Sequence, residues 1–424
     1  MATTPPADIA VHGSGITAHT TALLMADLGL RVQVSAPRLP MATANHANHA
    51  NHANNTHNTN NIHNAARDIR AYAINHSSQA TLASVGVWPA SGQAPWLTPV
   101  DHMRVFGDGA GFLSLHGQDA QPVAWMVDVP ALEDALAQLV VAHTRITTVA
   151  AGAAPLGTLN VLCEGKHSAQ RANLGINTPT TTYPHRALAA RLRSTQPHGG
   201  IAQQWFDGTS ILALLPVGGP QGCELAMVWS MPAQQCDDWI GSLQHASADT
   251  QPADLLQAIA QASRHSFAEL ALLGKPVAFG LTLSKATQWV QPGVALVGDS
   301  AHTIHPLAGL GLNMGLADAQ ALADVLRHRH KAQSVADMRL LRRYQRRRSS
   351  DTTRLQLATH GLFQLFTQRW GNSQPLQVLR NWGMLAFDAA TPLKRWVQSA
   401  GMGQVAKSKP PTQSTQSRQP TQSA

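Results

Sequence analysis

The chain has 424 residues, enough for two or three domains and for a sizeable buried core. Lys and Arg (31) outnumber Asp and Glu (23), and the net charge of +8 suits an anionic surface without identifying a partner. The three cysteines lie far apart in the sequence, which excludes a cysteine-built zinc site and a complete disulfide framework and favours a reducing compartment.

The first residues, MATTPP, lead almost directly into an apolar strand. They lack the basic start and apolar core of a secretory signal. No stretch approaches the roughly 20 apolar residues that cross a bilayer. We therefore expect a cytoplasmic protein, whose contact with the inner membrane would be peripheral.

A glycine-bearing turn follows this first strand. The strand at 9–11 leads into the sequence GSGITA and a helix, and a second strand ends at Ser35, which completes a βαβ unit. This is the G-x-G-x-x-A form of the dinucleotide fingerprint. Gly13 permits a tight turn, Gly15 lets the backbone approach a pyrophosphate, and Ala18 allows the helix and strand to pack closely. Glycine turns of this kind also occur for packing alone.

Residues 44–64 form a low-complexity segment of Asn, His, Ala and Thr with almost nothing to bury, which predicts a disordered insertion. Its histidines offer an alternative, a divalent metal site, which the flexible setting disfavours. These histidines are His46, His49, His52, His57 and His63. Further along, apolar runs at 159–162, 211–216 and 294–297 predict strands, and the chain as a whole reads as an α/β core with an additional sheet.

The most specific stretch is GDSAHTIHPLAGLGLNMGL at 298–316, which follows the strand at 294–297 and opens a helix with apolar residues at three-to-four spacing. Asp299, at the strand end, can accept hydrogen bonds from the ribityl or ribose hydroxyls of a flavin nucleotide. Backbone N–H groups of Gly311, Leu312 and Asn313 can stabilise negative charge on a reduced flavin.

Two histidines in the same stretch, His302 and His305, could instead suggest a metal. Pro306 interrupts regular helix there, and no third ligand is evident. We therefore expect no metal site.

A basic stretch lies at 339–348, where six arginines are interleaved with apolar residues as in a helix. A solvated helix face is the simpler interpretation, and docking to lipid headgroups or to a partner is the alternative. No aromatic platform or known binding motif accompanies the charge, so we expect no nucleic-acid partner.

Several further segments occur in a recognisable order with the two glycine motifs. They are 68–88, which begins Asp68-Ile69-Arg70; 163–171, similar to an Asp-Gly motif; 202–216; and the C-terminal stretches 344–348 and 379–393. Together they resemble the single-component FAD-dependent aromatic hydroxylases typified by para-hydroxybenzoate hydroxylase, and among these the hydroxylases of ubiquinone biosynthesis. The resemblance spans nearly all of residues 8–403 apart from the inserted segment.

This resemblance implies an α/β fold with a Rossmann-like FAD-binding domain, a mixed β-sheet substrate domain and C-terminal helices. The implied FAD-binding domain comprises 1–180 and 285–345, and the substrate domain 181–284. A helical region at 346–403 and a disordered tail at 404–424 would follow.

The resemblance also implies a reaction. NADPH or NADH reduces FAD, O2 adds to give a flavin C4a-hydroperoxide, and this species delivers one oxygen atom to an activated aromatic ring. The implied substrate is a prenylated phenol or quinol precursor of ubiquinone. Its lipid tail would favour peripheral membrane contact, and the pathway would favour a place in a biosynthetic complex.

Residue roles follow from position in the matching motifs. Gly13, Gly15 and Ala18 would hold the pyrophosphate. Ser35 would contact the ribose, and Arg70 would face the phosphates or the flavin edge.

The second motif would hold the other end of the cofactor. Asp299 would bind the sugar chain, while Pro306 and the stretch Gly311-Leu312-Asn313 would shape the site of the isoalloxazine ring. His305 is a candidate general base, with loop stabilisation as the alternative role.

Four positions depart from the family pattern: Ser35 replaces an acid, Glu164 an aspartate, Leu310 a glutamine and Val129 an amide side chain. Each lost polar contact costs about 1 kcal/mol. One alternative is therefore a scaffold protein that has lost efficient FAD turnover. Another is a flavoprotein that performs reduction or halogenation, because related flavoproteins share the first fingerprint.

Overall fold

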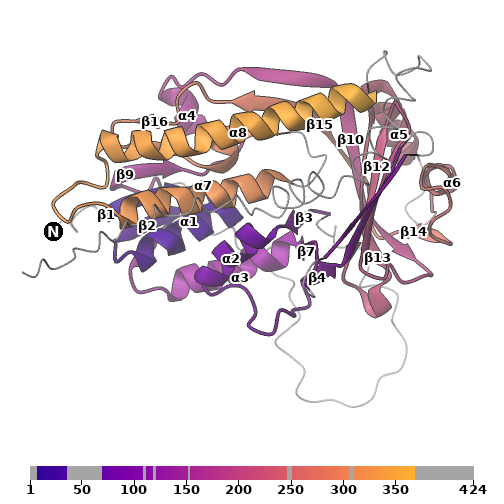
Figure 1. The fold of residues 1–424 in the computed structure, drawn as a ribbon, viewed down its shortest axis with the longest axis horizontal. Coiled ribbons are helices and arrows are strands. Elements are labelled where there is room, and N and C mark those ends of the chain that lie inside the picture. The colour runs from indigo at the N-terminus through magenta and orange to yellow at the C-terminus, as the bar shows by residue number, and fades with distance from the viewer. Residues whose placement is uncertain are drawn as a thin grey trace, which may run out of the picture.

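A computed structural model describes residues 7–35, 69–107, 111–117, 121–150, 153–245, 251–304 and 310–367. Within these residues the strands form three sheets, and helices cover them (Figure 1). The predicted insertion at 44–64, the C-terminal stretch 379–393 and the tail at 404–424 lie outside the described residues. None of the described helices combines the length and the apolar character that crossing a membrane requires.

The first sheet has six strands in the order β16-β17-β9-β1-β2-β8, and all neighbours are parallel except β16 and β17. Its strands are β1 (Ala7–His12), β2 (Val32–Ser35), β8 (Ile146–Val149), β9 (Gly157–Leu162), β16 (Val290–Gln291) and β17 (Val294–Leu296). The strands predicted at 9–11, 159–162 and 294–297 are confirmed. A parallel strand that is covered on both faces reads as a continuous apolar run, which is why these segments were recognisable.

Helices pack on this sheet in a layer. Helix α1 (Ile16–Asp27) lies between α3 (Val129–Ala142) and α7 (Leu310–Arg327), and α8 (Met338–Thr367) runs along α7 (Figure 1). The shorter helices α2 (His76–Ser84) and α4 (Ala169–Asn173) complete this part. One continuous apolar core joins the sheet to α1, α3, α7 and α8.

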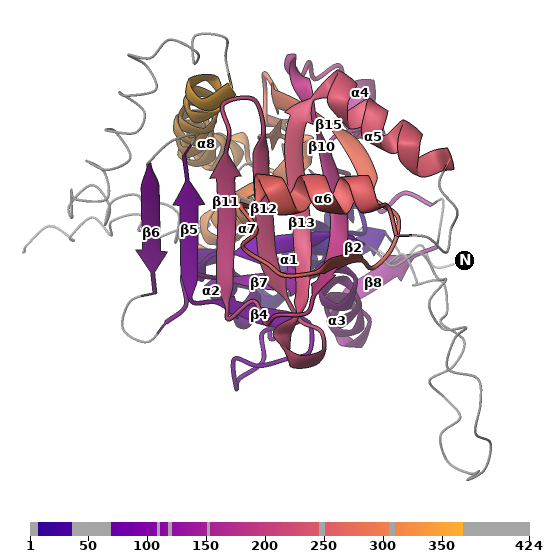
Figure 2. The ribbon, with the colours of Figure 1, turned by 90° about the vertical axis from the view of Figure 1, so that its right-hand side faces the viewer.

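The second sheet has nine strands, in the order β18-β15-β10-β13-β12-β11-β5-β6 with β14 paired to β10. They are β5 (His102–Phe106), β6 (Phe112–His116), β10 (Thr180–Ser194), β11 (Ile201–Phe206), β12 (Ile211–Val217), β13 (Glu224–Pro232), β14 (Leu270–Leu272), β15 (Val277–Lys285) and β18 (His302–Thr303). Helices α5 (Ala233–His245) and α6 (Ala253–Ala262) cover its outer face (Figure 2).

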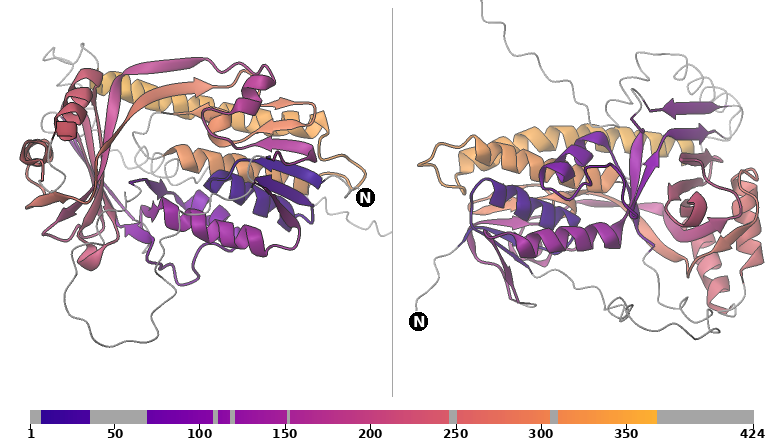
Figure 3. Two further views of the ribbon diagram at one scale, coloured as in Figure 1. Left: turned by 180° about the vertical axis from the view of Figure 1, so that it is seen from behind. Right: turned by 90° about the horizontal axis from the view of Figure 1, so that it is seen from below.

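A small sheet, β3-β7-β4, lies against the inner face of the nine-stranded sheet. Its strands are β3 (Ala71–Ile74), β4 (Leu97–Val100) and β7 (Ala124–Asp128). Two long strands of the nine-stranded sheet, β10 and β15, extend from it toward the six-stranded sheet and run beside α8 (Figure 3). There β15 pairs with β18, the strand formed by the second glycine motif, so the two larger sheets meet beside that motif.

This architecture confirms the predicted α/β class with a Rossmann-like part and a mixed sheet. The predicted domain limits stay a proposal. Two observations bear on them: β5 and β6 belong to the nine-stranded sheet although they precede residue 180, and α8 continues across the proposed limit at 345.

Candidate functional site

The first glycine turn lies at the carboxyl end of β1, in the centre of the six-stranded sheet. Gly13 has a φ of +130°, and a Cβ there would lie 2.4 Å from the carbonyl oxygen of Cys163, so only glycine fits. Its backbone N–H donates to the Ser35 Oγ at 3.3 Å, so Ser35 does stand beside the turn at the end of β2.

The N-terminus of α1 follows directly. Gly15 is the N-cap of this helix without a side-chain capping bond, and the first turn carries no acidic residue. Ala18 is fully buried and lies beside Gly13. Because the first N–H groups of a helix lack intrahelical partners, this end fits an anion such as a pyrophosphate.

The second glycine motif contacts this same turn of α1. A Cβ on Gly298 would lie 3.2 Å from the Thr17 Cγ2, and a Cβ on Gly315 would lie 2.9 Å from the Thr17 Oγ1. Thr17 therefore packs against both glycines. The structure brings together two turns that lie almost three hundred positions apart in the chain, as the sequence predicted.

The turn after β17 exposes Asp299, whereas its neighbours Gly298 and Ser300 are buried. Although the Asp299 side chain reaches solvent, the protein around it desolvates the carboxyl group and raises its pKa, the nearby charge of Asp318 adds to this, and His302 opposes it. A carboxylate placed in this way can accept hydrogen bonds from sugar hydroxyls.

Helix α7 begins at Leu310, close to that turn. A Cβ on Gly311 would meet open space, and Leu312 is partly buried against the core. The side chain of Asn313 is engaged with the protein: its Nδ2 donates to the Ala73 carbonyl at 2.7 Å, and its Oδ1 accepts from the Asn75 N–H at 2.9 Å. We therefore expect Asn313 to contact a flavin through its backbone groups.

The segment at 163–171, which resembles an Asp-Gly motif, contacts the second glycine motif. Glu164 accepts hydrogen bonds from the Ser168 hydroxyl and the Gln170 N–H, so the glutamate organises the start of α4. Arg171 donates to the carbonyl of Ser300 at 2.9 Å. The sequence identified the segment but did not predict the bond between Arg171 and Ser300, because these residues lie 129 positions apart.

Arg70 is connected to the first glycine turn through Glu133. Its guanidinium forms an ion pair with Glu133 of α3, with an Nη2 to Oε2 distance of 3.0 Å. Glu133 in turn lies 3.8 Å from where a Cβ of Gly15 would stand. Sequence reasoning missed Glu133, which follows the fully buried Val129 by one helical turn. An acid one turn into a helix gives no signal of its own.

Asp318 is the other residue that sequence reasoning missed. It is fully buried in α7 and bonded to His302 of β18 and Arg348 of α8. A single acid among the apolar positions of a predicted helix was the available signal, because a buried carboxylate needs partners. His305 and Pro306 lie outside the described residues. In the part of the chain that the structure describes, no cluster of three metal-ligating side chains occurs.

The arrangement fits a flavin dinucleotide. A glycine turn and a helix N-terminus with free N–H groups form one end of the site, and an exposed carboxylate with the start of a second helix forms the other. The two ends are joined by Thr17.

Known proteins resemble the chain over most of its length. The FAD binding domain family matches residues 159–357. The chain is 28% identical over 427 residues to a 3-demethoxyubiquinol 3-hydroxylase of Escherichia coli strain K12, covering 95% of this chain and 100% of the enzyme. It is 26% identical to the ubiquinone hydroxylase UbiL of Rhodospirillum rubrum, covering 94% and 90%. Among solved structures, the probable FAD-dependent monooxygenase pqsL of Pseudomonas aeruginosa shares the fold, with a TM-score of 0.64, 18% identity, and coverage of 90% of this chain and 99% of that chain.

Proposed function

We propose that the chain hydroxylates a prenylated phenol or quinol precursor of ubiquinone. The premise is its homology to the hydroxylases of ubiquinone biosynthesis and the fold that it shares with FAD-dependent monooxygenases. It is an enzyme that uses FAD, with NAD(P)H as reductant and O2 as co-substrate. The scaffold alternative is not favoured.

One observation carries the substrate proposal. The similarity to a protein named for a ubiquinol ring hydroxylation extends over 95% of this chain, so it includes the strands of the nine-stranded sheet as well as the flavin motifs. A resemblance confined to the glycine motifs would support FAD binding alone.

The chain's own residues would hold the cofactor as follows. The N-terminus of α1 and the glycine turn would bind the pyrophosphate, with Ser35 near the ribose and Arg70 turned from Glu133 toward the phosphates. Asp299 would accept from the sugar chain, and the first N–H groups of α7 would stabilise negative charge on the ring. When bound and reduced by NAD(P)H, FAD supplies the activation of O2.

The inner face of the nine-stranded sheet would exclude water from the substrate ring. Residues alternate between the two faces of a strand, so Ala226 and Val228 of β13 share one face, and Ala226 packs toward the small sheet. Ala187 and Ala189 of β10 lie on the same face, opposite Ser230 and Val228. The small apolar side chains on this face suit a ring with a hydrocarbon tail. His305 and Pro306 remain proposed as residues beside the reacting ring.

Ring hydroxylation is tested with the purified, FAD-loaded protein, NADPH and isotope-labelled O2. We expect one labelled oxygen atom in a ubiquinone precursor. Flavin reduction and consumption of O2 without label in the product would contradict monooxygenation. In cells that lack the protein, the accumulating precursor identifies the ring carbon, and an unchanged quinone pool would contradict the pathway assignment.

We further propose peripheral contact with an anionic membrane surface. Arg339, Arg342, Arg343 and Arg346 of α8 are all exposed. The protein should bind vesicles that contain anionic lipid more strongly than neutral vesicles, and salt should reverse this binding. Equal binding to both kinds of vesicle would contradict the proposal. A place in a biosynthetic complex is a further expectation from the relatives' pathway.

A further inference from the structure

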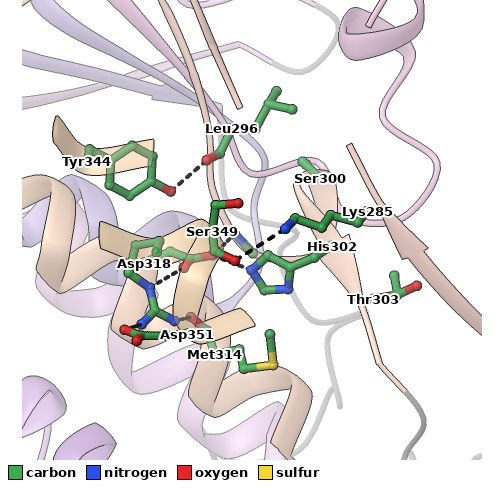
Figure 4. A network of polar contacts seen from close by, with 12 residues as sticks. Lys285, Leu296, Ser300, His302, Thr303, Met314, Asp318, Tyr344, Ser349 and Asp351 are labelled. Atoms are coloured by element: carbon green, nitrogen blue, oxygen red, sulfur yellow. Dashed lines mark hydrogen bonds and ion pairs between the residues drawn. The ribbon is translucent and has the colours of Figure 1, made fainter. Parts of the chain in front are cut away.

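A buried carboxylate underlies the turn that carries Asp299. The Asp318 side chain is 0% exposed and accepts three hydrogen bonds (Figure 4). Its Oδ2 accepts from the Gly298 N–H at 3.0 Å and from the His302 Nε2 at 2.6 Å. Its Oδ1 accepts from the Arg348 Nε at 2.7 Å. Both oxygens are therefore used.

These bonds fix the turn at both ends. Gly298 begins the turn and His302 follows it, and the Ala301 N–H donates to the Gly298 carbonyl at 2.8 Å. Ser300 and Ala301 are 0% exposed and His302 is 1% exposed, whereas Asp299 is exposed. Anchored in this way, the turn leaves the Asp299 side chain as its exposed group.

The third partner connects the turn to the C-terminal helix. Arg348 of α8 neutralises Asp318, while its Nη1 also reaches the Asp351 carboxylate at 3.2 Å. Burial by itself raises the pKa of Asp318, but the charges and hydrogen bonds of His302 and Arg348 outweigh it, so the carboxyl stays ionised with a lowered pKa. The Tyr344 hydroxyl, one turn earlier in α8, donates to the Leu296 carbonyl at 2.7 Å and ties the same helix to β17.

We propose that Asp318, held by Arg348, is a positioning residue for flavin binding, which acts by fixing the direction of the Asp299 carboxylate. This inference rests on the proposed role of Asp299. It does not depend on which aromatic substrate the enzyme uses.

The test is a double-mutant cycle on the full chain prepared without FAD. The readout is the dissociation constant of FAD, measured by quenching of flavin fluorescence. In Asp318→Asn, one amide cannot accept from Gly298 and His302 and from Arg348 at once, because its NH2 group faces donors on one side. We expect Asp299→Asn and Asp318→Asn each to raise the dissociation constant by roughly tenfold.

The double variant decides the mechanism. If Asp318 acts through Asp299, Asp299→Asn/Asp318→Asn binds FAD about as weakly as either single variant, because coupled residues are not additive. Multiplied effects would overturn the proposal, and so would normal FAD affinity in Asp318→Asn. If Asp299→Asn weakens binding and Asp318→Asn does not, this inference fails alone, whereas an unchanged affinity in Asp299→Asn would contradict the cofactor role of Asp299 as well.

The chain offers a matched control on the same two helices. Asp324 of α7 accepts from Arg347 of α8 at 3.4 Å, but Arg347 is 57% exposed and Asp324 is 23% exposed, whereas Asp318 is fully buried. Asp324→Asn should leave the dissociation constant within about twofold of the wild-type value. If Asp318→Asn does not fold, as judged by thermal unfolding, His302→Leu and His302→Gln replace it in the cycle. His302→Gln keeps a donor for Asp318 and should bind FAD more tightly than His302→Leu, and equal weakening would overturn the proposal.

Discussion

Of the two glycines in the first glycine turn, Gly13 is the more confined. In Gly13→Ala, the new methyl group would lie 2.4 Å from the Cys163 carbonyl oxygen, and the φ of +130° is strained for alanine. We expect a loss of about 2–4 kcal/mol in the free energy of unfolding and at least tenfold weaker FAD binding. Urea unfolding and FAD titration measure these two effects.

Gly29 supplies the control for this prediction. It follows α1 with a φ of +82°, and a Cβ there would meet nothing within 4 Å. Gly29→Ala should therefore cost only the backbone penalty, about 1 kcal/mol. If the two variants lost the same stability, the contact with Cys163 would not explain the requirement for glycine.

His19 gives the stability of the protein a specific pH dependence. It is 1% exposed in α1, and neither ring nitrogen has a hydrogen-bond partner among the described residues. Burial lowers the pKa of His19 from 6.5 to about 4. The unfolded chain therefore takes up a proton below pH 6.5 that the folded protein resists, so this contribution is present above pH 6.5 and is lost as the pH falls toward 4.

The variant His19→Leu isolates this effect. Between pH 7 and pH 4 its free energy of unfolding should fall by about 3 kcal/mol less than that of the wild type, in urea titrations at several pH values. Burial also lowers the pKa values of His185 and His198, but both residues are present in both proteins and cancel in the comparison. Parallel pH profiles would show that His19 is protonated at the same pH in the folded and unfolded chains.

At the scale of elements, the Asn313 side chain ties α7 to the small sheet. Asn313 bonds to the Ala73 carbonyl at the end of β3 and to the N–H of Asn75, the N-cap of α2. We expect Asn313→Ala to lose about 2 kcal/mol of unfolding free energy, since it removes both bonds, and Asn313→Asp to lose at least as much, since it sets a buried carboxylate oxygen against the Ala73 carbonyl. Urea unfolding measures the difference.

A second amide on the same helix is the matched control. Gln320 donates to Asp324 within α7 at 2.8 Å, and this bond joins it to no other element among the described residues. Gln320→Ala should change the free energy of unfolding by less than about 0.5 kcal/mol. A comparable loss in Gln320→Ala and Asn313→Ala would mean that helix propensity, rather than the tie to β3, sets the cost.

At the scale of the whole molecule, the sequence predicted the features that neighbouring residues determine, namely the strands and the glycine turns. Buried parallel strands read as apolar runs, and the glycine motifs identified the two turns that Thr17 joins. Contacts between distant residues carried no such signal. Arg348 is one of six arginines in its stretch, and only the packing of α8 on α7 selects it as the partner of Asp318. Likewise, the bond from Gly13 to Ser35 could not be read from a strand-end serine.

Arg191 joins the parts of the molecule in a similar way. It is 2% exposed in β10 of the nine-stranded sheet, and its Nη2 donates to the Arg70 carbonyl at 2.9 Å and to the Asp128 carboxylate at 3.1 Å. Asp128 belongs to the small sheet and Arg70 immediately precedes its strand β3, and Arg70 also pairs with Glu133, which lies close to Gly15. This side chain therefore links the proposed substrate face to the proposed cofactor site.

Arg191→Met should test whether this link holds the two parts together. We expect a loss of about 2–3 kcal/mol of unfolding free energy, because Asp128 is half-buried and can regain water only in part. Amide hydrogen exchange should quicken in β3 and β7 more than in β1. Arg186, on the same strand, pairs with Asp237 at the surface, so Arg186→Met should cost less than about 1 kcal/mol. Equal costs, with uniform exchange, would mean that apolar packing between the sheets suffices without Arg191.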